Sequence, residues 1–127
     1  MTVLPTNTLL GKLDLIEVYE YHDKPLLFAC RNASGTHYVV VQIDADDEQE
    51  VWFYVSVSPM RFQQVRSGEI DLHDAFAKAE DGFVLGVKVF GDARMQAQVE
   101  MIPVDKLSDE QLPDAGERLN LVPAVLG

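Results

Sequence analysis

The chain has 127 residues, of which 47% are hydrophobic and 24% are charged, and 21 acidic residues against 10 Lys and Arg give a formal net charge of −11. This length is typical of one domain with a single core, and the apolar content excludes a disordered chain. Because strong negative charge repels nucleic-acid phosphates, the composition argues against DNA or RNA binding and favours a basic protein partner.

The start of the chain predicts a protein without a membrane anchor. The stretch "MTVLPTNTLLGKLDL" has no basic n-region and no long apolar run, which a signal peptide or a membrane-spanning helix would need. The single Cys30 cannot form a disulfide within the chain, and its apolar surroundings predict a buried small side chain, not a reactive thiol. We therefore expect a cytoplasmic protein that contacts no membrane.

The first half of the chain is predicted to be β-sheet. It is rich in Val, Ile, Tyr, Phe and Trp, and short polar stretches interrupt it. Strands are expected near residues 12–21, 26–31, 36–43 and 51–57, joined by "HDKP", "NASG" and "DADDEQE". Such short connections favour antiparallel neighbours, so the prediction is a four-stranded meander.

Alternation along the third and fourth predicted strands assigns their two faces. One face is expected to be core and carries His37, Val39, Val41 and Ile43 with Val51, Phe53, Val55 and Val57. The opposite face is not strongly polar, since it carries Tyr38, Val40, Trp52 and Tyr54. We expect a helix, the C-terminal segment or a partner protein to cover that second face.

Two short helices are predicted after the fourth strand. Ser58 is a good N-cap, Pro59 suits the first helical position, and Gly68 is a stop signal. Asp71 can cap a second helix, whose apolar residues follow helical spacing at Leu72, Ala75, Phe76 and Ala79. The two helices are thus expected to meet at one glycine turn.

A second hairpin and a tail complete the predicted fold. "FVLGVKVF" and "RMQAQVEMI" alternate around a "GDA" turn, and Ser108 with Gln111 forms a capping box. The fold class is therefore α+β, a single domain with an antiparallel β meander followed by two short helices and a second β-hairpin. We expect its core over about residues 9–112 and a docked or mobile tail at 113–127.

The predicted partner-binding surface is an acidic hairpin beside two aromatic side chains. It comprises Asp44, Asp46, Asp47, Glu48, Glu50, Trp52 and Tyr54. Tyr and Trp often carry binding hot spots, and acidic side chains suit a basic partner. The aromatic face, to which we also assign Tyr19 and Tyr21, is either covered by the protein's own second layer or forms a homodimer.

No metal site, cofactor or catalytic residue is predicted. A calcium-binding EF-hand loop needs Gly at its sixth position and Glu at its twelfth, where this chain has Gln49 and Val55. The three histidines lack the spacing of metal ligands. The chain also lacks a phosphate-binding glycine loop and a G-x-S-x-G nucleophile elbow.

Two further functions remain open at this point. A small-molecule or anion-binding domain would use Ser58, Arg61 and Arg66, because the amide groups at a helix start attract anions. We favour a different role for the two arginines, which is to balance nearby carboxylates. A hydrolase-type enzyme would need a pocket around three further residues, Asp71, His73 and Asp74.

Three stretches of the chain resemble a family of short, uncharacterised bacterial proteins. They are "LLGKLDLIEVYEYHDKPLLFACRNASGTHYVVVQID", "VWFYVSVSPMRFQQVRSGEIDLHDAF" and "EDGFVLGV". The residues that match are Gly11, Tyr19, Pro25, Gly35, Tyr38, Gly68, Leu72, Phe76, Glu80 and Gly82. His73 departs from the pattern, where a basic residue is expected. The resemblance implies no activity, cofactor or catalytic residue.

The sequence therefore predicts a non-enzymatic, intracellular protein-interaction module. Its basis is the net charge of −11 together with the missing catalytic motifs. An immunity protein or antitoxin is the specific form that we consider. Small bacterial proteins often occur near toxin genes, and an acidic protein can dock on the basic active site of a nuclease.

Overall fold

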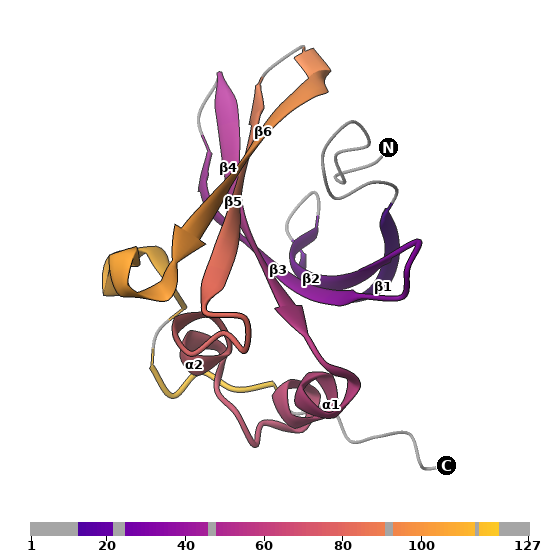
Figure 1. The fold of residues 1–127 in the computed structure, drawn as a ribbon, viewed down its shortest axis with the longest axis vertical. Helices are drawn as coiled ribbons and strands as arrows, with labels where there is room; N and C mark the ends of the chain where they lie inside the picture. Colours follow the sequence, from indigo (N-terminus) through magenta and orange to yellow (C-terminus); the bar gives the residue numbers. More distant parts are fainter. Residues whose placement is uncertain (1–12, 22–24, 46–47, 91–92, 114, 120–127) are drawn as a thin grey trace.

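The computed structural model describes residues 13–21, 25–45, 48–90, 93–113 and 115–119. These residues form one six-stranded antiparallel sheet in which every strand pairs with its neighbours in the sequence (Figure 1). The strands are β1 (Leu13–Tyr21), β2 (Pro25–Asn32), β3 (His37–Ala45), β4 (Gln49–Val57), β5 (Phe83–Phe90) and β6 (Ala93–Pro103). The predicted α+β class, meander and second hairpin are confirmed, and pairing of β5 with β4 joins them into one sheet.

Two helices and two 3₁₀ turns complete the fold. α1 (Pro59–Ser67) and α2 (Leu72–Ala77) lie in the connection between β4 and β5, and η1 (Val104–Lys106) and η2 (Asp109–Gln111) follow β6. The predicted caps are present, since Ser58 accepts from the Arg61 amide at 3.2 Å and Asp71 accepts from the Asp74 amide at 2.7 Å. Figure 1 shows both helices beside one end of the sheet.

α2 ends two residues earlier than its apolar spacing predicts, at Ala77 instead of Ala79. The backbone leaves the helical conformation at Lys78, which has φ −120° and ψ 44°. The Arg61 guanidinium holds the carbonyls at this end, donating to Asp74 O at 3.2 Å and to Lys78 O at 2.7 Å. A side chain from the neighbouring helix thus binds carbonyls at the end of α2, where a helix leaves carbonyl groups without partners of its own, although Asp74 O also accepts from the Lys78 amide.

The helix-side face of the sheet carries the larger core. Val39, Phe53 and Val55 from the strands pack with Phe62, Val65, Leu72 and Phe76 from the helices and with Leu112, all at most 8% exposed. The predicted core face is confirmed at these positions, while Val41 and Ile43 are only partly buried against it. The helices therefore seal one part of this face and leave another part less covered.

The opposite face of the sheet carries a second, aromatic core. Trp52 and Tyr54 are each 1% exposed and pack with Phe28, Tyr38, Val40 and Val87. Phe28 meets Trp52 edge to face at a centroid distance of 5.8 Å, and Tyr38 meets Tyr54 in the same way at 6.1 Å. Figure 1 shows the sheet curving, so that β1 and β2 turn away from the direction of β4 to β6.

A short piece of the predicted tail is docked against the two helices. The Leu72 amide donates to Glu117 O at 2.7 Å, and the Gly116 amide donates to the Asp71 carboxylate at 2.9 Å. Gly68 at the end of α1 has φ 85°, and a Cβ there would lie 2.5 Å from Leu119 O. Glycine is thus required at this turn, both by its left-handed backbone and by the tail. Residues 114 and 120–127 of the predicted tail lie outside the described residues.

Among the residues described, no helix is long and apolar enough to cross a membrane.

Candidate functional site

The predicted acidic hairpin lies at the far end of β3 and β4 from the helices. Asp44 and Glu48 are exposed there, and Glu50 is half-buried, with its Oε1 accepting from Trp52 Nε1 at 3.2 Å. Asp46 and Asp47 lie outside the described residues. The Asp44 carboxylate also accepts from the following backbone amide at 2.9 Å. The hairpin therefore presents negative charge, with part of it fixed by local hydrogen bonds.

Trp52 and Tyr54 are buried, which agrees with the alternative that the protein itself covers this face. Both side chains belong to the aromatic core, so neither can contribute to a contact surface in this fold. Tyr19 does not share their face either, because it packs against the helix-side core. Register shifts in β1, between Leu15 and Glu17 and again after Val18, break the simple alternation that grouped these aromatics. The side chain of Tyr21 lies outside the described part of the chain.

Arg66 forms an ion pair with Glu17 across the interface between α1 and β1. Its Nε and Nη2 each donate to a Glu17 oxygen at 2.8 Å, and both side chains are mostly buried, at 15% and 29% exposure. Burial alone would raise the pKa of Glu17, but hydrogen bonds from Arg66 and Tyr19 outweigh it and hold this pKa below its usual value. Arg66 thus balances a carboxylate, as favoured from the sequence.

Ser58 and Arg61, the other two residues of the predicted anion site, also have internal partners. The Ser58 amide donates to Glu80 Oε1 at 2.8 Å, and its hydroxyl lies 3.0 Å from Oε2. Arg61 caps the end of α2, and its Nε is buried without a hydrogen-bond partner among the described residues. The Glu80 carboxylate therefore occupies the start of α1, and Arg61 and Arg66 bind other groups of the protein. The structure does not bring these three residues together as one anion site.

Asp71, His73 and Asp74 do come together at the start of α2. Their potential ligand atoms lie within 4.8 Å of one another, and His73 Nδ1 is 3.4 Å from Asp74 Oδ1. Both oxygens of Asp71 already accept backbone hydrogen bonds, from Asp74 and Gly116, and these bonds lower the pKa of its carboxyl group. The cluster therefore caps α2 and anchors the tail, which is a structural role.

Cys30 is confirmed as a buried small side chain. It is fully buried in the aromatic core, and burial raises the pKa of its thiol to about 12. The thiolate form, which is the reactive one, is therefore strongly disfavoured at neutral pH.

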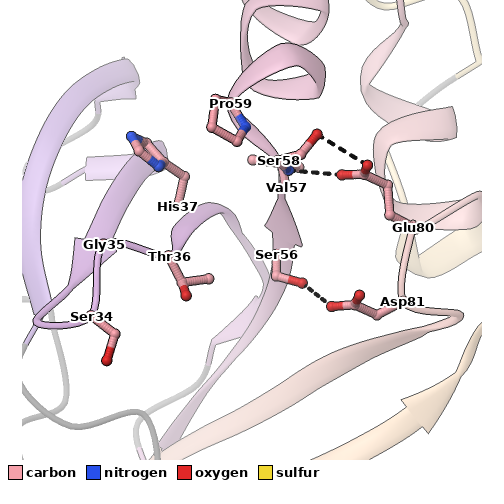
Figure 2. Close-up of a pocket in the computed structure, with 10 residues that line it drawn as sticks. All are labelled: Ser34, Gly35, Thr36, His37, Ser56, Val57, Ser58, Pro59, Glu80 and Asp81. Atoms are coloured by element: carbon pink, nitrogen blue, oxygen red, sulfur yellow. Dashed lines mark hydrogen bonds between the residues drawn. The ribbon is translucent and has the colours of Figure 1, made fainter.

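A polar cleft of about 380 Å³ lies where β4 runs into α1 (Figure 2). Three segments far apart in the sequence line it: the turn between β2 and β3, the end of β4, and the turn between α2 and β5. The lining residues are Ser34, Gly35, Thr36, His37, Ser56, Val57, Ser58, Pro59, Glu80 and Asp81. This cleft is the strongest candidate site because it gathers hydroxyl and carboxylate groups that the sequence keeps separate.

Both turns that flank the cleft are held by hydrogen bonds that their backbone amides donate. Asn32 Oδ1 accepts from the amides of Ser34 and Thr36 at 3.0 and 2.9 Å. On the other side, the Gly82 amide donates to Ala79 O at 3.0 Å and fixes the turn that contains Glu80 and Asp81. The walls of the cleft are therefore ordered before any ligand arrives.

Glu80 and Asp81 bring two adjacent carboxylates to the cleft, and both residues are exposed. Figure 2 shows Glu80 pointing at Ser58 and Asp81 pointing at Ser56, each joined by hydrogen bonds. No Lys or Arg is among the lining residues that the structure describes. The chemistry of the cleft is thus that of a negatively charged acceptor, suited to a cation with several N–H donors.

His37 does not complete a catalytic arrangement with the serines of the cleft. Its ring stacks against the Phe62 ring at a centroid distance of 5.0 Å, and Figure 2 shows it directed away from Ser56 and Ser58. Nucleophilic catalysis would need a base within hydrogen-bond reach of the hydroxyl group. The described side chains of the cleft therefore suit ligand binding better than nucleophilic catalysis by Ser56 or Ser58.

A family model described as "Family of unknown function (DUF6575)" matches residues 1–121. The chain belongs to this family. No curated protein and no solved structure matches it significantly. The family assignment agrees with the resemblance to uncharacterised proteins and adds no activity, so any function must be argued from the site.

The two carboxylates of the cleft were missed in the sequence because "EDG" after α2 suggests only a helix stop. The sequence signal is limited to two acidic residues before Gly82, in a turn that leads directly into β5. Acidic residues in such a turn are commonly solvated, and only the tertiary fold places these two beside Ser56 and Ser58.

Proposed function

We propose that the protein is a non-enzymatic interaction module that binds a basic protein partner, and that the cleft of Figure 2 receives a Lys or Arg side chain of that partner. The observation that carries this proposal is the pair of exposed carboxylates, Glu80 and Asp81, in a cleft whose described lining residues include no Lys or Arg. A guanidinium or ammonium group would add charge-assisted hydrogen bonds to both carboxylates.

The orientation of the carboxylates supports binding of a cation. Ser56 and Ser58 already hold Asp81 and Glu80 in place, so little side-chain entropy is lost when a ligand binds. Each carboxylate has about four lone-pair sites, so oxygens that accept one hydrogen bond can still accept another. The serines therefore preorganise the site without saturating it.

An apolar contact is available next to the cleft. Met60 follows Pro59, which lines the cleft, and its side chain is 74% exposed. Methionine is enriched at protein interfaces, where its flexible side chain adapts to a partner. A basic residue flanked by an apolar one is thus the sequence feature that we expect in the partner.

The acidic hairpin supports the same partner in a different way. The cleft lies at the start of β3 and the hairpin at its end, so the strand separates them by roughly 25 Å at about 3.3 Å per residue. Asp44 and Glu48 are therefore too distant to share one small contact with Glu80 and Asp81. Together with the net charge of −11, they would attract a basic protein and speed its approach.

Inhibition of a basic toxin inside a bacterial cell is the specific form of this function that we favour. A nuclease active site exposes the Lys and Arg side chains that bind nucleic-acid phosphates. An acidic cleft that accepts such a side chain would block it, as an immunity protein or antitoxin does.

Paired neutralised variants test the proposal. Glu80→Gln with Asp81→Asn removes the charge of the cleft, and Asp44→Asn with Glu48→Gln removes the same charge from the hairpin. Each protein is used as bait for host-cell extract at low and high salt, and NMR spectra verify that both variants are folded. We expect basic partners to bind the wild type and the hairpin variant, to bind more weakly at high salt, and to be lost from the cleft variant.

A defined probe removes the dependence on an unknown partner. Acetyl-Gly-Arg-Gly-amide titrated into ¹⁵N-labelled protein should shift the amides of residues 34–37 and 80–82, and acetyl-Gly-Gln-Gly-amide should not. Equal losses of partners in the two charge variants, or shifts that do not depend on the arginine, would contradict the assignment of the cleft.

A further inference from the structure

A second cavity lies on the helix-side face of the sheet, beyond the area that α1 and α2 cover. It has a volume of about 490 Å³ and lies over β4, β5 and β6. Its lining includes Ile43, Val51, Phe53, Lys88, Glu100 and Ile102. None of these residues belongs to the cleft of Figure 2. This groove is therefore a separate feature, and an inference about it does not depend on the proposed partner site.

The strand register fixes the arrangement of the groove. In one row of paired residues, Phe53 lies opposite Gly86 and Gly86 lies opposite Glu100. In the next row on the same face, Val51 lies opposite Lys88 and Lys88 lies opposite Gln98. Val51 from β4 and Ile102 from β6 thus bring apolar side chains to the groove, and Lys88, Gln98 and Glu100 bring charged or polar ones. The pairing therefore places apolar and charged groups next to one another.

Gly86 makes room for the Ile102 side chain at the floor of the groove. It is a buried glycine without a positive φ, so its backbone does not require glycine. A Cβ at this position would lie 2.8 Å from Ile102 Cδ1 and 3.8 Å from Phe53 Cε1. The Ile102 side chain therefore lies over Gly86, where it gives the groove an apolar floor.

Lys88 and Glu100 place opposite charges beside this apolar floor. They are diagonal neighbours on adjacent strands, a relation that sets such residues about 7–8 Å apart. Both residues are exposed, and they form no ion pair with each other or with another residue in the part of the chain that the structure describes. One positive and one negative group thus remain available next to an apolar surface.

We propose that this groove binds a small zwitterion with an apolar side chain, namely an apolar α-amino acid. Its carboxylate would meet Lys88, its ammonium group would meet Glu100, and its side chain would lie on Val51 and Ile102, which are only partly buried. Charge complementarity selects this ligand class. A zwitterion carries one group for Lys88 and one for Glu100, and because it has no net charge, the net charge of −11 on the protein does not repel it. A simple anion or cation would satisfy only one of them.

NMR titration of ¹⁵N-labelled protein tests the ligand class. L-leucine and L-phenylalanine should shift the amides of Phe53, Gly86, Lys88 and Glu100. N-acetyl-L-leucine lacks the ammonium group and L-leucinamide lacks the carboxylate. Because each derivative loses one charged hydrogen bond, its affinity should be lower than that of L-leucine by at least about tenfold. Absence of shifts with every probe, or equal shifts with the two derivatives and leucine, would overturn the proposal.

Variants then test the site. Lys88→Gln and Glu100→Gln should each weaken L-leucine binding by at least about tenfold, and Gly86→Val should abolish it by pushing the Ile102 side chain into the groove. Lys106→Gln and Glu69→Gln remove exposed charges outside the groove and serve as matched controls. Binding that survives Lys88→Gln and Glu100→Gln would contradict the assigned roles even if Gly86→Val fails to fold. The groove could instead be filled by a second copy of the chain, and sedimentation velocity tests this alternative. A dimer in the wild type that dissociates in Gly86→Val would overturn the amino-acid proposal.

Discussion

The two faces of the sheet are both buried, but by different means. On the helix-side face, aliphatic residues of β3 and β4 pack under α1 and α2, and the core draws on elements far apart in the sequence. On the other face, aromatic rings from β2, β3 and β4 pack edge to face against one another in a curved sheet. The comparison teaches that aromatic side chains on a strand need not mark an interface, because they can pack against one another and against other residues of the same sheet.

The difference between the two faces also explains where the two candidate sites of this protein lie. The aromatic face has its largest rings at its centre, whereas the helix-side face is only partly covered. The cleft lies at one edge of the helices and the groove lies beyond them. Both candidate sites therefore arise where two short helices end before they cover the whole sheet.

Truncation of a ring on the aromatic face is expected to have the largest effect. Trp52→Ala should lower the free energy of unfolding by about 3–5 kcal/mol, as is usual for a fully buried aromatic side chain. Phe76→Ala on the helix-side face is the matched comparison and should cost a similar amount. Urea denaturation followed by circular dichroism measures both. A loss below about 1 kcal/mol for Trp52→Ala would mean that the aromatic face is not a core.

Local patterns in the sequence account for most of the fold. Strand alternation placed β3 and β4 and their core face, and cap residues placed the starts of α1 and α2. These features depend on residues close together in the chain, so a reader of the sequence can find them. The irregular pairing of β1 was beyond such reasoning, because a register shift has no fixed residue pattern.

The candidate sites could be predicted only in part. The negative charge of the hairpin and the role of Arg66 followed from the sequence, although not the partner Glu17, which lies 49 residues away. The cleft depends on hydrogen bonds between residues 22 and 25 positions apart. The packing of Ile102 over Gly86 in the groove depends on the register of the strands. Such contacts are set by the tertiary fold, which single-sequence patterns do not encode.

Loss of the ion pair between α1 and β1 should have an intermediate effect on the free energy of unfolding. The Glu17→Gln variant tests how much the ion pair contributes to holding α1 on the helix-side face. Glu17→Gln should lower stability by about 1–2 kcal/mol at neutral pH, since a bidentate, partly buried charge pair is lost. The pKa of Glu17 is lowered in the folded protein, so its contribution is present above its usual value of 4.5 and is lost as the pH falls through the folded pKa. The difference between wild type and variant, measured by urea denaturation from pH 7 to pH 3, should therefore shrink at low pH. A constant difference would contradict this role.

The cap of α2 should contribute less. Asp71→Ala should cost about 1 kcal/mol, because it removes the N-cap of a short helix together with the hydrogen bond from the Gly116 amide. The neighbouring His73→Ala leaves both bonds in place and serves as the control. Thermal unfolding compares the two, and hydrogen exchange at the Gly116 amide should quicken only in Asp71→Ala. Equal effects of both variants would show that the cluster acts through His73 instead of through the cap.

The rim of the aromatic face should show the smallest effect, which separates the core of this face from its edge. Leu15 lies opposite Cys30 in the register, on the aromatic side of the sheet, but its side chain is 48% exposed on edge strand β1. Leu15→Thr keeps a residue that favours strands and should change the free energy of unfolding by less than about 0.5 kcal/mol in urea denaturation, as for most surface substitutions. Trp52→Ala and Leu15→Thr should thus differ several-fold although both alter the same face. A large loss for Leu15→Thr would mean that the aromatic core extends to the edge of the sheet, and β1 would then be as firmly packed as β4.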